Sequence, residues 1–193
     1  MTSDLSTPAL IQLLRSYYPT GLSPGDPAYM ASAEARRLQE VKADAGKDMG
    51  AWKAFVQRVR ETLPDSSLWD MSLPFYDPCY RLRVSLPHQP PDSSQDDAVV
   101  CLLSLLAPAY VLYASHSLYT GPYMEQWTRY PPLPAAFQAC EAQLAGLVEA
   151  TFRATLLPKE ALFTPVTDMT PPVGNLALGQ ARLADLLFTS DRW

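Results

Sequence analysis

The sequence predicts an α+β fold, in which an antiparallel sheet of three or more strands packs against about four helices. Apolar residues recur at helical spacing in the first third of the chain and again near residue 140, whereas the segments between them alternate or are continuously apolar. A run of helices followed by a run of strands is typical of the α+β class. The predicted strands are near neighbours in the sequence, which favours antiparallel pairing.

The composition fits one globular domain. The chain has 193 residues, of which 48% are hydrophobic and 18% are charged, as in ordinary folded domains. No linker is long enough to separate two domains. We therefore expect a single domain over 1–193, with a helical part at 1–64, a sheet at 79–116, a helix at 133–157 and a mixed tail at 158–193.

Three helices are predicted in the first part. Thr7-Pro8 gives a capping residue followed by proline at the first helical position, and Asp26-Pro27 repeats this pattern. The second helix is expected to run to Gly46 or Gly50, with Met30, Ala33, Leu38 and Val41 on its apolar side. The third has the clearest apolar stripe, formed by Trp52, Phe55, Val56, Val59 and Leu63, and Pro64 ends it.

The strands come next. From Cys79 to Leu86 the chain alternates strictly, which predicts one buried face and one solvated face that carries Arg81, Arg83 and Ser85. Val99–Tyr113 is rich in apolar residues and is interrupted at Ala107-Pro108, which predicts a hairpin of two buried strands. The apolar run that contains this hairpin, Ala98 to Ala114, has 17 residues, fewer than the roughly 20 that a membrane helix needs, so we expect no membrane span.

The last third is less regular. Pro134 is expected to begin a helix with Phe137, Cys140, Leu144 and Val148 on its apolar side, and Pro158 to end it. The segment 178–188 fits either a short helix or a strand.

Charge and cysteine content narrow the function classes. Fifteen Lys and Arg against 20 Asp and Glu give a net charge of −5, which argues against a generic nucleic-acid binder and permits a basic protein partner. Cys79, Cys101 and Cys140 are widely spaced and form no CxxC pair, so we expect free thiols and neither disulfides nor a metal site. The N-terminus lacks the pattern of a signal peptide, which makes a cytoplasmic location the default.

Candidates for catalysis are few. The two histidines, His88 and His116, could each act as a general base, and a Cys101–His116 pair would need a suitable strand register. No phosphate-binding, nucleophile-elbow or zinc-protease motif is complete. We therefore expect no catalytic residue, no cofactor and no metal, while a small hydrolase-like enzyme that uses His88 or His116 stays open as an alternative.

Two sets of residues are candidates for partner binding. The first is aromatic, and we expect it to lie in a proline-rich loop, where it either anchors a partner or covers the sheet: Tyr119, Tyr123, Trp127 and Tyr130. The second is an acidic set that we expect in one loop, where it would steer a basic partner: Asp92, Asp96 and Asp97.

Four segments together resemble a known group of proteins. They are the alternating strand Tyr80–Leu86, the apolar Tyr110–Tyr113, the Pro-Val-Thr-Asp segment at Pro165 and the closing stretch from Leu186 to Trp193. In this pattern the chain is similar to the small α+β immunity proteins that are encoded beside bacterial polymorphic toxins. The resemblance implies a cytoplasmic protein without catalytic residues that binds one toxin enzyme and blocks its active site. A structural subunit of a bacterial assembly is the other alternative.

Overall fold

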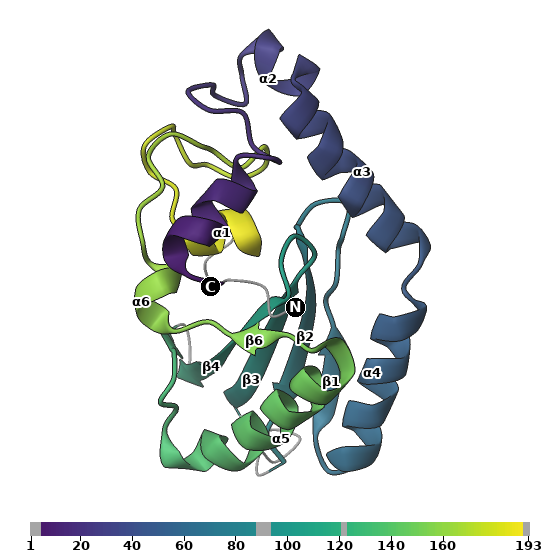
Figure 1. Ribbon diagram of the computed structural model, residues 1–193. Coiled ribbons are helices and arrows are strands. Elements are labelled where there is room, and N and C mark those ends of the chain that lie inside the picture. Colours follow the sequence, from purple (N-terminus) through teal and green to yellow (C-terminus); the bar gives the residue numbers. More distant parts are fainter. Residues whose placement is uncertain (1–4, 88–93, 121–122, 191–193) are drawn as a thin grey trace.

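The computed structural model describes residues 5–87, 94–120 and 123–190. Within them an antiparallel sheet is combined with helices on both of its faces (Figure 1), which confirms the α+β prediction. The strands are β1 (Ser67–Asp70), β2 (Cys79–Ser85), β3 (Gln95–Ser104), β4 (Ala109–Thr120), β5 (Tyr123–Arg129) and β6 (Thr155–Leu156).

The sheet follows the chain order from β1 to β5, and each strand is antiparallel to the next. The predicted hairpin over Val99–Tyr113 is confirmed as β3 and β4, and both strands extend beyond it. β4 pairs with β5 along its second half and in parallel with the short β6 at its start. The edge strands of the five-strand path are therefore β1 and β5.

Among the helices of the described residues, four have eight residues or more and three are short. The helices are α1 (Thr7–Leu14), α2 (Pro27–Ala31), α3 (Ala33–Lys47), α4 (Gly50–Thr62), α5 (Ala135–Phe152), α6 (Lys159–Leu162) and α7 (Leu183–Leu187). In Figure 1, α5 crosses in front of the sheet, α4 runs along its side, and α1 lies near α7 at the other end.

The first core lies between the sheet and helices α4 and α5. The apolar stripe predicted on the third helix is buried, because Trp52, Phe55, Val56 and Val59 face the even-numbered residues of β2 and β4. Trp52 stacks on Tyr80 with ring centroids 4.8 Å apart. From α5, the predicted residues Phe137, Cys140, Leu144 and Val148 close the same core.

A second core covers part of the opposite face, where α1, α7 and the tail fold back on β3 and β4. Leu14 and Leu187 belong to the same core cluster as Val100, Leu102 and Val111. The expectation that Arg81 lies on a solvated face is therefore wrong. The tail covers that end of the sheet, and Arg81 is only 5% exposed and pairs with Asp77 at 3.3 Å.

The second predicted helix is in fact two helices that meet at Ser32. This residue has extended backbone angles, and its hydroxyl accepts a hydrogen bond from the Ala35 N–H at 3.0 Å, which caps α3. The break also changes which residue is buried. Met30 is exposed, whereas Tyr29 is buried and donates its hydroxyl to the carbonyl of Thr170 at 2.6 Å.

The helix after Pro134 ends earlier than predicted. Arg153 adopts a left-handed conformation with a φ of 52°, which ends α5 before Pro158 and leads into β6. In the segment 178–188, residues 183–187 form the helix α7. In the described part of the chain, no helix is long and apolar enough to cross a membrane.

Candidate functional site

Most of the aromatic segment 119–130 that the structure describes, residues 119–120 and 123–129, belongs to the sheet, so the prediction of a loop there is wrong. Tyr119 lies in β4, and β5 pairs with β4 from Ala114↔Arg129 to Thr120↔Tyr123. We call this pair of strand segments, residues 114–120 and 123–129, the ribbon. Each face mixes large apolar or aromatic side chains with polar ones: Tyr123, Glu125, Trp127 and Arg129 of β5 lie on one face, and Met124, Gln126 and Thr128 lie on the other. The chain therefore lacks the strict alternation that marks a half-buried strand.

The inner end of the ribbon is fixed by two of the predicted aromatic residues. Trp127 stacks on His116 with centroids 4.9 Å apart and meets Phe137 edge-on at 5.8 Å, while the Arg129 guanidinium lies 4.8 Å from its ring. Tyr130, just beyond β5, packs edge-on against Phe163 on the other face of the sheet. These two rings bind the ribbon to both cores.

The outer end of the ribbon exposes the other two predicted aromatic residues. Tyr123 is 77% exposed and Tyr119 is 53% exposed, and the neighbouring Met124 is also 53% exposed. Tyr119 lies opposite Met124 in the register, so these two side chains share one face, and Tyr123 points to the other. A ribbon that is fixed at its base thus presents tyrosines at its tip.

Two of the three predicted acidic residues lie on β3, which makes the prediction of one acidic loop wrong for them. The Asp96 carboxylate accepts a hydrogen bond from the Arg83 guanidinium at 2.7 Å, and Asp97 contacts His116 Nδ1 at 2.5 Å. A basic group of the same chain therefore lies against each carboxylate. Asp92 lies outside the described residues.

His116 lies within the sheet, and the described part of its surroundings supports a structural role. The register places Asp97 and Trp127 directly beside it on neighbouring strands. Cys101 pairs with Leu112, four residues along β4 from His116, which corresponds to about 13 Å at the rise of a strand. The register thus separates the two groups of the possible Cys101–His116 pair. His88 lies outside the described residues.

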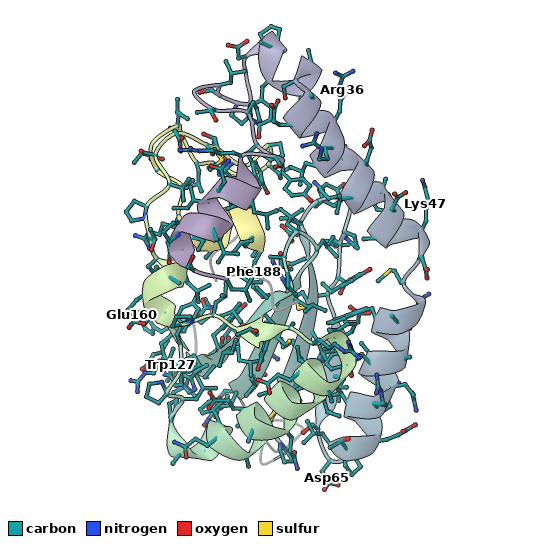
Figure 2. All side chains as sticks on the ribbon, in the orientation of Figure 1. Arg36, Lys47, Asp65, Trp127, Glu160 and Phe188 are labelled. Atoms are coloured by element: carbon teal, nitrogen blue, oxygen red, sulfur yellow. The ribbon has the colours of Figure 1, made fainter. Side chains whose placement is uncertain are left out.

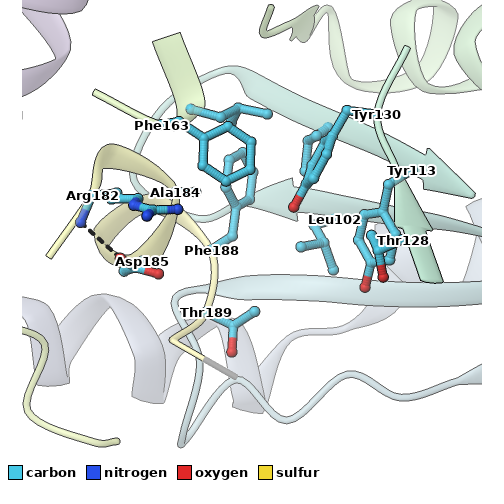
Figure 3. Close-up of a pocket in the computed structure, with 12 residues that line it drawn as sticks. Leu102, Tyr113, Thr128, Tyr130, Phe163, Arg182, Ala184, Asp185, Phe188 and Thr189 are labelled. Carbon is cyan, nitrogen blue, oxygen red and sulfur yellow. Dashed lines mark hydrogen bonds between the residues drawn. The ribbon is translucent and has the colours of Figure 1, made fainter. Parts of the chain in front are cut away.

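The opposite face of the sheet holds a cavity of about 200 Å³ between β4, β5, α6 and α7. Its walls include Leu102, Tyr113, Phe163 and Phe188, and Arg182 lies at its side with its guanidinium over the Phe163 ring at 5.2 Å (Figure 3). Asp185 is buried there and accepts a hydrogen bond from the Arg182 backbone N–H at 2.7 Å. The cavity is mainly apolar.

The three cysteines are free and buried. Burial raises the pKa of the Cys101 and Cys140 thiols to about 12, and it also raises the pKa of Cys79, to which Asp77 adds. They are therefore neutral and unreactive near pH 7. Across the described ranges no three His, Cys, Asp or Glu side chains are grouped so that they could hold a metal ion.

A second exposed aromatic surface escaped the sequence analysis. We call it the β1 shelf, and it consists of exposed apolar side chains on β1 and the loop that follows: Trp69, Met71, Leu73, Phe75 and Tyr76. In the sequence this stretch combines aromatic residues with Pro74, the same signal that drew attention to 119–130. Phe75 of the shelf packs against Gly46, the residue before Lys47. Figure 2 shows Lys47 and Trp127 on opposite sides of the molecule, so the shelf lies far from the base of the ribbon.

Comparisons of the chain with protein-family models, with curated proteins and with solved structures found no match.

Proposed function

We propose that this protein binds another protein and inhibits it, and that it is a cytoplasmic immunity protein that blocks the active site of a bacterial toxin enzyme. One observation carries the proposal: the ribbon is fixed at its base by Trp127 and exposes Tyr119 and Tyr123 at its tip. Binding energy in protein interfaces concentrates in a few aromatic anchors, and a rigid support lowers the entropy lost on binding.

The charge of the chain supports a basic partner. The net charge is −5. Glu125 is exposed on β5, between Tyr123 at the tip of the ribbon and Trp127 at its base. Asp96 and Asp97 contribute less than the sequence suggested, because Arg83 and His116 lie against them. Blocking then rests on the aromatic tip entering the active-site opening, and acidic groups raise the rate of association.

The test first reads the gene immediately upstream of this one, which should encode a toxin enzyme; a neighbour of another kind would count against the proposal. Wild type should protect cells that express this toxin and should bind it in solution. Tyr123→Ala and Tyr119→Ala should each weaken binding by about 30-fold, the equivalent of roughly 2 kcal/mol for a lost aromatic anchor. Met30→Ala removes a side chain of similar exposure on α2 and serves as the matched control, with unchanged affinity expected.

A second measurement separates blocking from catalysis. If the protein acts by blocking, the double variant His88→Ala, His116→Ala should still protect wherever it folds and binds the toxin; affinity is measured alongside protection, because removal of the His116 ring also takes away the stack against Trp127. Loss of protection at unchanged stability and unchanged toxin affinity would instead support the hydrolase-like alternative. If neither tyrosine variant changes affinity while wild type binds the toxin, the ribbon is not the binding surface.

A further inference from the structure

The edge strand β1 has an open side. Met71 donates its backbone N–H to the carbonyl of Arg81 at 2.9 Å, just beyond the last paired residue of β1. Along an antiparallel strand, the main-chain N–H and C=O groups of successive residues point alternately toward the partner strand and away from it. Because the Met71 N–H points toward β2, the N–H and C=O groups of Leu68 and Asp70 point away from it. No described strand pairs with this side of β1.

The β1 shelf lies beside this open edge and is strongly apolar. Trp69 is 64%, Phe75 63% and Tyr76 62% exposed. At about 150–250 Å² for each aromatic side chain, these three rings alone expose on the order of 400 Å². A standard interface takes about 800 Å² from each partner. Met71, Leu73 and the neighbouring Val173 add to this surface, which brings it near the size of a stable dimer interface.

The shelf is held firmly from below. The ammonium of Lys42, a buried residue, donates to the Tyr76 carbonyl at 2.8 Å, and the Tyr76 N–H donates to the Leu73 carbonyl at 2.8 Å. The Phe75 ring lies on Gly46, where a Cβ atom would come within 2.8 Å of it. The exposed rings are thus displayed by an ordered loop, which lowers the entropy that an interface would lose on forming.

The charged groups of the shelf are already used within the chain. The Asp70 carboxylate accepts hydrogen bonds from the Trp52 indole and from the Ser72 N–H, each at 3.1 Å. Asp77 pairs with Arg81. The shelf therefore offers little charge by which to select a charged foreign surface, whereas its open strand edge and apolar side chains can match an identical surface.

We propose that two copies of this chain associate through β1, about a twofold axis beside Trp69. In this arrangement Trp69 lies opposite Trp69 of the second copy, and Leu68 lies opposite Asp70 of the second copy. The outward main-chain groups of Leu68 and Asp70 then pair across the axis, the two indoles meet as a cross-strand aromatic pair, and no two carboxylates face each other. The association involves the sheet edge opposite to the ribbon and does not depend on the proposed inhibitory function.

The first test is sedimentation equilibrium of the full chain over micromolar concentrations. Wild type should form a concentration-dependent dimer, and Trp69→Lys should weaken it by about 30-fold or more. Tyr123→Lys, which changes an aromatic residue of similar exposure on β5, is the matched control and should leave the dimer intact. A wild type that is monomeric throughout, or a dimer that Trp69→Lys does not weaken, would overturn the proposal.

A second test reads the register by disulfide formation. Trp69→Cys places a thiol opposite its own copy at a Cα separation of about 4.5–5.5 Å, within the range for a disulfide. Ser67→Cys lies on the same face, but two residues from the axis, and is about 13 Å from its own copy. Under mild oxidation, Trp69→Cys should form covalent dimers much faster than Ser67→Cys. Equal rates would contradict the twofold arrangement, and the native thiols are buried and do not compete.

Discussion

Trp127 lies nearly flat against His116, with the ring planes 15° apart, because the β4–β5 register pairs the two residues directly. The same imidazole contacts Asp97 on β3, so three strands are joined in one row across the sheet. This row separates the packed rings of Trp127 and Tyr130, at and just beyond the base of the ribbon, from the exposed rings of Tyr119 and Tyr123 at its tip.

The packed and exposed aromatic residues should respond differently to truncation. Trp127→Ala removes a ring that contacts His116 and Phe137, so we expect the free energy of unfolding to fall by about 2 kcal/mol. Tyr123→Ala, at an exposed position, should change it by less than about 0.5 kcal/mol. Urea unfolding of both variants measures the difference. Equal stability of the two variants would mean that the stack contributes nothing to folding.

Charges introduced into the two cores should prevent folding. Leu103 faces the core under α4 and α5, and Val111 faces the core under α1 and α7; both are at most 6% exposed. An unpaired carboxylate at either position should cost more than about 4 kcal/mol. Leu103→Asp and Val111→Asp should therefore be unfolded or insoluble on expression. Thr120→Asp, on an exposed position of β4, is the control, and cooperative thermal unfolding of either core variant would contradict this assignment.

The buried thiols should make the protein sensitive to alkali. Their pKa values are raised in the folded state, so above about pH 9 the unfolded chain loses protons that the folded chain keeps. Stability should then fall with rising pH, by about 1.4 kcal/mol per pH unit for each thiol until the folded-state pKa is reached. A thiol reagent at pH 8 should label none of the three cysteines in the native protein and all three in denaturant. Rapid labelling of the native protein would show that a thiol is accessible.

Lys42 should give the opposite dependence on pH. Burial lowers its pKa, although Asp77 acts in the other direction. The folded chain therefore releases this proton at a lower pH than the unfolded chain does, and the stability cost of the buried charge declines as the pH rises toward 10.5.

The measurement compares wild type with Lys42→Met, so that the effects of the thiols and tyrosines cancel. The stability of wild type relative to Lys42→Met should increase as the pH is raised from 7 to 10. Lys47→Met, which removes an exposed ammonium from the same helix, is the matched control for loss of charge. A constant or declining difference for Lys42→Met would show that its charge is not penalised in the fold.

The fold class, the apolar stripes of α4 and α5 and the central hairpin could all be predicted from the amino-acid sequence. These features follow from local periodicity: Trp52, Phe55 and Val59 recur at helical spacing, and β3 and β4 contain runs that only a buried strand accommodates. Burial in both cores then agrees with the local preference, so no other part of the chain was needed to predict them.

Which residues of the candidate site are exposed depends on the packing of distant segments and could not be predicted. Tyr123 and Trp127 stand four residues apart in one strand and point to the same face, and it is Phe137 of α5 and His116 of β4 that partly bury one ring and leave the other exposed. Asp96 and Asp97 appeared to be free loop acids, until the β2–β3 and β3–β4 pairings brought Arg83 and His116 against them. Exposure and ion pairing depend on contacts between distant segments, and such contacts leave no periodic trace in the sequence of either segment.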